Sequence, residues 1–311
     1  MRADKQPGAT TTSAAALTMR LRRAGWWPWV LIAPLLGGIT VFSWYPILDT
    51  GYLSLTEKAV FKDSMFVGLD NYAALLQDPR LLTALGNTFA YMGIVLLGVP
   101  IAIYLAALLN LPGLRFVLLF RTLFFLPYIA MPAAVAMVWR LIYSGDFGVL
   151  NWALSLVGID GPYWLSTPGL AIVAVAVVGL WASIGFHIII LGAGLKSIPP
   201  ALYEAAELDG AGRWRRLRSI TVPLLTPSIF FVVVVTVLGG FQVFDLVYTI
   251  LGDHSPAAIP SATLVYLFYR EAFVSNNQGY AAAISMVILL LVGVCTAIQF
   301  QLQKRWVFDG S

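Results

Sequence analysis

Few side chains in this sequence could take part in chemistry, and the clearest is a carboxylate inside an apolar run. Asp245 lies in the run of roughly 223–251, with Gln242 three residues before it and Tyr248 three residues after it. A charge at the centre of a membrane helix costs about 2.5–3.5 kcal/mol, so an acid there is a functional hypothesis by default. Residues at this spacing share one face of a continuous helix. They offer acceptors and donors for a polyhydroxylated solute, while a purely structural hydrogen bond from Asp245 remains the alternative.

Three further residues extend this candidate solute pathway. The rings of Trp181 and Phe241 could stack on a sugar ring, although packing against lipid is the commoner explanation for such aromatics. His187, inside the fourth apolar run, is more readily explained as a residue that hydrogen-bonds between helices than as a ligand.

The sequence predicts no catalytic residue, metal site or bound cofactor. His187 and His254 are far apart without ligand-spaced partners, and the single cysteine, Cys295, lies in an apolar run. Residues 192–197 superficially resemble a phosphate-binding loop. That motif needs Gly directly before its Lys, whereas Leu195 stands there, and no strand precedes it.

The elements that position these residues are expected to be membrane helices. The chain is 59% hydrophobic and only 11% charged, with a mean hydropathy of +0.84, whereas a soluble domain is about 25% charged. A helix needs about 20 apolar residues to cross the bilayer core. Since the apolar runs lack the strict alternation of a transmembrane barrel, we expect an all-α integral membrane fold. Six runs are long enough, at roughly 27–48, 84–109, 117–142, 169–195, 223–251 and 279–302.

The placement of positive charge predicts the orientation. With a cytoplasmic amino terminus, most Lys and Arg residues fall on the inner side, which satisfies the positive-inside rule and puts both termini in the cytoplasm. The net charge of +4 therefore reports topology, and we expect a lipid bilayer rather than nucleic acid as the partner. The inner-side residues are Arg2, Lys5, Arg20, Arg22, Arg23, Arg115, Arg121, Lys196, Arg213, Arg215, Arg216, Arg218, Lys304 and Arg305.

The domain organisation follows from these runs. We expect a cytoplasmic, partly disordered tail over 1–25, one six-helix domain over 26–303 and a short cytoplasmic tail over 304–311. The first run is too long for a signal peptide and no cleavage site follows it, so it is interpreted as a retained anchor. The pair Gly239-Gly240, midway along the fifth run, is the preferred candidate hinge.

A dense polar loop, 196–222, interrupts the apolar pattern between the fourth and fifth runs. Prolines at 199 and 200 end the fourth helix, because proline cannot continue the helical ladder. A short helix is predicted from Ala201, with Glu204 and Glu207 one turn apart and Gly210 as its C-terminal stop. Such a helix would lie across the cytoplasmic surface and transmit rigid-body motion from a soluble partner, whereas a merely solvated loop is the alternative.

The order of motifs along nearly the whole chain resembles the permease subunits of the carbohydrate branch of ABC importers, which take up maltose, multiple sugars and glycerol 3-phosphate. In that family the polar loop is the EAA loop, which receives the force of ATP hydrolysis. The other segments that carry the resemblance are Gly68 to Tyr72, Asn87-Thr88, Arg121, Phe124 to Pro127, Trp139, Gly148, Asn151, Phe244-Asp245 and Gly279 to Ser285.

The resemblance implies the type I importer permease fold, with six transmembrane helices and a cytoplasmic coupling helix. It implies a location in the bacterial cytoplasmic membrane and three kinds of protein partner: a second, related permease in a heterodimer, a dimeric cytoplasmic ATPase and an extracytoplasmic solute-binding protein. ATP and magnesium would belong to the ATPase, so this chain would not be an enzyme. The residues implied in ATPase coupling are Glu204, Ala205, Ala206, Asp209, Gly210, Ala211 and Pro223.

A membrane-embedded enzyme or a secondary carrier without an ATPase partner is the other hypothesis. Either would predict paired carboxylates or histidine clusters that face each other across helices in the middle of the membrane, and the sequence contains no such pattern.

Overall fold

The computed structural model describes residues 26–57, 65–111, 113–252 and 255–306, and the side chains of 28, 305 and 306 are outside that description. The predicted tail over 1–25, His254 and most of the predicted tail over 304–311 therefore lie outside the described residues. The chain forms two compact units, Met1–Tyr52 and Leu53–Ser311.

The described part of the first unit is one helical span built of three elements. α2 (Trp27–Ile39) continues through a π-helical turn, η1 (Thr40–Trp44), into α3 (Tyr45–Leu53). The stretch Trp29–Leu53 is long and apolar enough to cross a membrane, and none of its hydrophobic window is buried within the chain. A helix that is apolar all round must be covered by lipid or by other protein.

The second unit begins with a small hairpin and a short helix. β1 (Thr56–Glu57) pairs antiparallel with β2 (Met65–Phe66), and α4 (Asp70–Gln77) follows. The next span starts earlier than the predicted residue 84, as α5 (Pro79–Leu96), because Pro79 occupies the first helical turn and Asp78 caps it. After a break at Leu97 the span continues as α6 (Gly98–Leu109).

The third apolar run is not the single helix that was predicted. It divides into α7 (Val117–Ile129) and α8 (Pro132–Ile142), which meet at 96°. Ala130 and Met131 adopt extended ψ values of 147° and 121°, as expected just before a proline, which disfavours helical geometry in the preceding residue. The next loop contains a short helix, α9 (Val149–Ser155).

α10 (Leu170–Lys196) is the central helix of the second unit and matches the predicted fourth run. It packs against α5, α6, α7, α14 and α15. Close approach to α7 depends on Gly185, since a Cβ atom there would overlap the carbonyl oxygen of Phe124.

The fifth run is also not one helix. A short α13 (Val222–Leu224) leads into α14 (Thr226–Phe241), with a 71° bend between Arg213–Leu224 and Thr226–Phe241. α14 then ends, and the chain resumes as α15 (Asp245–Leu251). The break falls just after the proposed Gly239-Gly240 hinge. A backbone carbonyl in the break is satisfied from another part of the chain, since Thr263 Oγ1 donates to the carbonyl of Val243 at 3.1 Å.

The last elements are α16 (Leu264–Tyr269), a π-helical turn, η3 (Arg270–Val274), and α17 (Gln278–Trp306). The described residues thus contain four helices long and apolar enough to span a membrane, or up to six spans if each bent pair is one. The chain is an all-α, multi-pass membrane protein.

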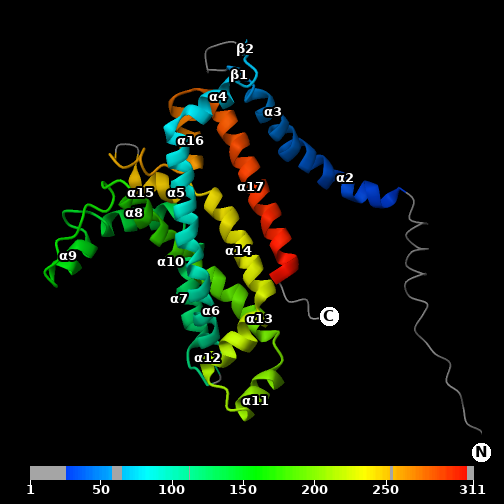
Figure 1. Cartoon of the computed structure of the whole chain (residues 1–311), viewed down its shortest axis with the longest axis vertical. Helices are drawn as coiled ribbons and strands as arrows, with labels where there is room; N and C mark the ends of the chain where they lie inside the picture. Colours follow the sequence, from blue (N-terminus) through cyan, green and yellow to red (C-terminus); the bar gives the residue numbers. More distant parts are fainter. Residues whose placement is uncertain (1–25, 58–64, 112, 253–254, 307–311) are drawn as a thin grey trace, which may run out of the picture. The chain divides into compact units, whose positions relative to one another are not determined.

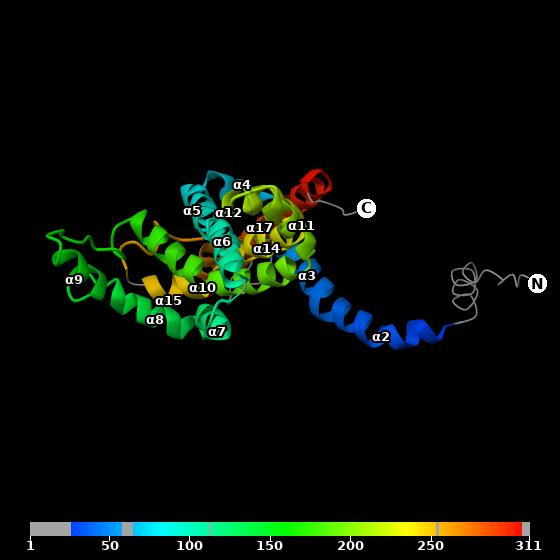
Figure 2. The same cartoon turned by 90° about the horizontal axis from the view of Figure 1, so that it is seen from below.

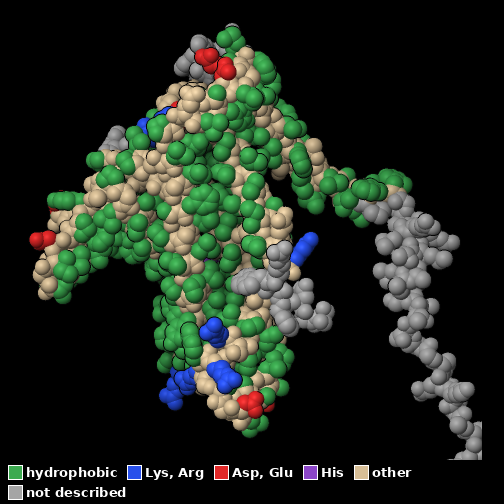
Figure 3. Space-filling view, viewed as in Figure 1, with side chains coloured by type: hydrophobic (Ala, Val, Ile, Leu, Met, Phe, Trp, Pro, Cys, Tyr) green, Lys and Arg blue, Asp and Glu red, His purple; other side chains and the backbone are tan. Residues whose placement is uncertain are grey.

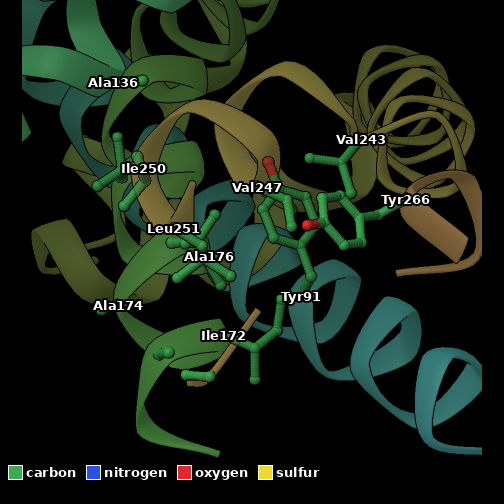
Figure 4. Packing of buried hydrophobic residues seen from close by; sticks show 14 of the residues in the cluster. Tyr91, Ala136, Ile172, Ala174, Ala176, Val243, Val247, Ile250, Leu251 and Tyr266 are labelled. Carbon is green, nitrogen blue, oxygen red and sulfur yellow. The ribbon is translucent and has the colours of Figure 1, made fainter. Parts of the chain in front are cut away.

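Within the second unit, α4 and α16 lie at one end, and α11 (Pro200–Leu208) and α12 (Arg213–Arg216) lie at the other (Figure 1). α8 and α15 pack side by side, as Figures 1 and 2 both show. One apolar cluster joins five helices between these ends (Figure 4). It includes Tyr91 of α5, Ala136 of α8, Ile172, Ala174 and Ala176 of α10, Val247, Ile250 and Leu251 of α15, and Tyr266 of α16.

Candidate functional site

The short helix predicted in the polar loop is present as α11 (Pro200–Leu208), and it ends before Gly210 as expected. The amide of Ala211 donates to the carbonyl of Ala206 at 2.8 Å, and the amide of Gly210 donates to that of Glu207 at 3.0 Å. This pair of bonds is the Schellman motif, which needs a left-handed residue at its centre. Gly210 supplies it with φ of +69°, so the sequence of the loop fixes a rigid helix end.

Two polar contacts hold α11 against the chain that follows it. Arg216, in α12 (Arg213–Arg216), places Nη1 3.0 Å from Glu207 Oε2. The hydroxyls of Tyr203 and Thr221 lie 3.0 Å apart, and Thr221 belongs to the π-helical turn η2 (Leu217–Thr221). Tyr203 and Glu207 are one helical turn apart, so both contacts hold the same face of α11. Sequence reasoning predicted neither contact; a tyrosine on a short polar helix was the signal available for the first.

The opposite surface of α11 is open. Glu204, Ala205 and Asp209 are exposed, whereas Ala206 and Ala211 are half-buried. Leu208 is 91% exposed and Trp214 is 72% exposed. Lys and Arg side chains gather at this end beside an acidic spot, while hydrophobic side chains dominate the spans (Figure 3). Large apolar side chains left in solvent among charges are typical of a protein docking surface.

Pro223 lies in α13, at the point where the chain turns from this loop into α14. The next residues bury their side chains, since Leu225 is 1% exposed and packs with Ile229 in a cluster with α6 and α10. Motion of α11 therefore has a packed connection to the central helices through η2 and α13.

The residues proposed for the solute pathway are arranged differently from the prediction. Gln242 lies in the break after α14, and Asp245 is the first residue of α15. The expectation that Gln242, Asp245 and Tyr248 share one face of a continuous helix is therefore wrong, because the helix is interrupted between the first two. Gln242 and Asp245 are both exposed. Tyr248 is half-buried and stacks on Phe244 with ring centroids 5.3 Å apart.

Two of the other candidates have aromatic neighbours. Phe241 is 1% exposed and meets Phe89 edge to face, with centroids 5.7 Å apart. Trp181 is 41% exposed and meets Trp139 edge to face at 5.4 Å. The structure thus groups Gln242, Asp245 and Tyr248 around the helix break and gives Phe241 and Trp181 ring partners of their own.

His187 joins two helices, as the sequence suggested. It is 2% exposed, and its Nε2 lies 3.0 Å from Thr236 Oγ1 of α14. That hydroxyl donates its proton to the carbonyl of Val232 at 2.7 Å, so the imidazole is the donor in the bond between them. Among the described residues no group of three or more His, Cys, Asp or Glu side chains could hold a metal ion.

Asn151 and Gly148, two residues of the motifs along the chain, have structural roles in the loop after α8. Asn151 donates to the carbonyl of Gly145 at 2.9 Å and of Gly161 at 3.3 Å, and accepts from Trp164 Nε1 at 2.6 Å. A side chain at Gly148 would overlap the carbonyl of Ser144. Asn151 and Gly148 therefore build the loop between α8 and α10, around a groove of about 640 Å³.

Comparison with known proteins gives one consistent pattern. Residues 94–308 match the family described as the binding-protein-dependent transport system inner membrane component. The chain is 34% identical over 277 residues to the arabinooligosaccharides transport system permease protein AraP of Halalkalibacterium halodurans, covering 88% of this chain and 87% of that protein. It is 35% identical to the lactose transport system permease protein LacF of Rhizobium radiobacter, covering 88% and 92%.

A third relative has a different solute in its name. The sn-glycerol-3-phosphate transport system permease protein UgpA of Yersinia pestis is 33% identical over 285 residues, covering 90% of this chain and 95% of that protein. Among solved structures, a chain of a bacterial alginate ABC transporter in complex with a periplasmic protein superposes with a TM-score of 0.80 at 24% identity, covering 93% of this chain and 98% of that one. At this identity the likeness shows the fold.

Proposed function

The chain belongs to the family of binding-protein-dependent transport system inner membrane components, and we propose that it is a permease subunit of an ATP-driven importer. It would form half of the pathway for a sugar or a related polyol or glycerol-phosphate solute. The names of its relatives, which include an oligosaccharide, a disaccharide and a glycerol-phosphate permease, support this range of solutes. They do not favour an enzyme or a carrier that works alone.

The observation that carries the proposal is α11. It is a short helix whose C-terminal end is fixed by Gly210. The contacts of Tyr203 and Glu207 hold one face of it, and Leu208 is exposed on another. A separate ATPase would dock on this surface, with Glu204, Ala205, Ala206, Asp209, Gly210, Ala211 and Pro223 forming or supporting the contact. ATP and magnesium would be bound by that ATPase.

The remaining partners follow from the same proposal. A second permease would complete the pathway, and a soluble binding protein would deliver the solute from outside. The excess of positive charge near α11 and α12 supports a cytoplasmic position for that end, with both termini inside. The end that contains α4 and α16 would then face the binding protein.

The solute would pass the break between α14 and α15. Gln242 and Asp245 expose an amide and a carboxylate within an otherwise apolar region, and a carboxylate is a strong acceptor for hydroxyl groups. Tyr248 borders the same break, whereas Phe241, Trp181 and His187 would support the wall from behind. An anionic solute would be repelled by Asp245 at short range, so a neutral sugar fits this site better.

A pull-down from native membranes tests the proposal. An affinity-tagged chain should co-purify an ATPase, and Leu208→Asp should abolish that association, because it places a charge at the exposed apolar contact. Leu76→Asp is the matched control, since Leu76 is 80% exposed but lies in α4 at the other end of the unit. Absence of any ATPase from the unaltered complex would contradict the proposal.

A further inference from the structure

Four side chains from three elements form a charged cluster at the end of the unit opposite α11. Arg80, at the start of α5, places Nη2 2.8 Å from Asp78 Oδ2 and Nη1 2.7 Å from Glu271 Oε1 of η3. The hydroxyl of Tyr280, near the start of α17, donates to Asp78 Oδ2 at 2.8 Å. We name Asp78, Arg80, Glu271 and Tyr280 the Arg80 clamp.

The two carboxylates of the clamp are removed from solvent. The exposed fraction of the side chain is 10% for Asp78 and 8% for Glu271, whereas Arg80 is 49% exposed. Burial alone would raise the pKa of Asp78, but hydrogen bonds from Arg80 and Tyr280 outweigh it and hold the pKa below its ordinary value of 3.8. Both acids thus depend on one guanidinium that spans them.

An ion pair with buried carboxylates contributes little net stability, since desolvation of the charges offsets their attraction. It does fix positions, because a buried carboxylate that loses its partner is strongly unfavourable. The planar guanidinium makes this placement more specific, since its N–H donors point in fixed directions. The clamp therefore specifies one placement of η3 relative to the starts of α5 and α17.

The chain segment that contains η3, residues 255–277, is tied to α5 a second time. Asn87 Nδ2 donates to the carbonyls of Pro260 at 2.8 Å and Ala262 at 2.9 Å. The amide of Leu264 donates to Thr88 Oγ1 at 3.1 Å. The segment 255–277, between α15 and α17, is thereby held by one helix, α5, at residues 260–264 and again at Glu271.

We infer that the Arg80 clamp positions the segment 255–277 for contact with the solute-binding protein and passes that contact to α5 and α17. The inference rests on the proposed function, which places this end outside. α5 packs against α10 and α14, and the opposite end of the unit carries α11. A force on the segment 255–277 would thus pass through packed contacts to the helices that connect to α11.

Stimulated ATP hydrolysis tests the inference. The whole complex, with its partner permease and ATPase, is reconstituted into proteoliposomes, and ATPase activity is measured against the concentration of solute-loaded binding protein. Arg80→Ala should raise the half-saturating concentration by about fivefold or more, the range of a moderate coupling between sites. The maximal rate should change less. Arg80→Lys should recover part of the loss, because it restores the positive charge but not the paired N–H donors of the guanidinium.

Two further variants keep the test valid if Arg80→Ala fails to fold. Glu271→Gln and Tyr280→Phe remove one charge or one hydroxyl while keeping the side-chain volume, and both should raise the half-saturating concentration in proportion to the bonds lost. Thr83→Ala is the matched control, because Thr83 is exposed on the same turns of α5 and bonds only locally, to the carbonyl of Pro79. It should leave the curve unchanged.

The outcomes separate the inference from the proposed function. If the clamp variants only reduce the amount of folded complex and leave the half-saturating concentration unchanged, the clamp is purely structural and the inference is overturned. If the unaltered complex shows no stimulation by any loaded binding protein, the proposed function itself fails.

Discussion

The hydroxyl groups of Tyr203 and Thr221 lie 3.0 Å apart and join the middle of α11 to the π-helical turn that leads into α14. Thr221 is 4% exposed and also bonds the carbonyl of Arg216. This contact links the proposed docking helix to the turn that leads into the packed helices behind it.

Removing that link should loosen coupling. Tyr203→Phe keeps the ring and loses one hydrogen bond, worth about 1 kcal/mol, so uptake per ATP hydrolysed should fall severalfold while the ATPase still associates. Tyr104→Phe is the control, because Tyr104 is 53% exposed on α6. Measurement of uptake and hydrolysis in the same proteoliposomes checks this, and an unchanged ratio would show that the link is dispensable.

Charge reversal at the exposed face of α11 should block docking. Glu204 is exposed on α11, so Glu204→Lys should leave folding and membrane insertion intact but reduce solute uptake severely. Immunoblotting of membranes and uptake by whole cells measure the two effects. The control is Asp160→Lys in the loop between α9 and α10, also exposed. Normal uptake by Glu204→Lys would remove α11 from the coupling pathway.

Thiol labelling should establish the orientation. With Cys295 replaced by Ser, a cysteine at Leu76 should react with an impermeant reagent added outside intact cells, and one at Trp214 should react only after permeabilisation. Both positions are accessible, at 80% and 72% exposed. The reverse pattern would place α11 outside and overturn the assignment of the docking helix.

The helix break should govern solute passage. Asp245→Asn keeps the volume of an exposed side chain but weakens its acceptor strength. Uptake should fall about tenfold while hydrolysis stimulated by loaded binding protein is less affected, because the ATPase surface is distant. Gln242→Ala should act in the same direction. Normal transport by both variants would make the break a structural feature only.

Glycines at two positions provide a matched pair for stability. Gly185→Ala would force a methyl group into the backbone of Phe124, so it should destabilise the contact of α10 with α7 by about 1–3 kcal/mol. Gly239→Ala meets no atom within 4 Å and should leave folding intact. Thermal unfolding of the purified variants in detergent compares them. A loss of transport by folded Gly239→Ala would support the hinge hypothesis.

The sequence by itself determined the local features of this protein. The positions of the apolar runs depend only on hydropathy, and α11 with its end at Gly210 depends on prolines before it and a glycine after it. The Schellman bonds of Ala211 and Gly210 close within six residues. Interactions of such short range are encoded by neighbouring residues, so they could be predicted before the fold was known.

Only the tertiary structure decided where the fifth run breaks and which polar groups meet. The interruption at 242–244 is compatible with the membrane because Thr263, 20 residues away, satisfies the carbonyl of Val243. Arg80 and Glu271 are 191 residues apart in the chain, and hydropathy does not report which distant donor meets which acceptor. Helix breaks and buried ion pairs depend on such partners, because in an apolar environment an unpaired polar group is too costly to persist.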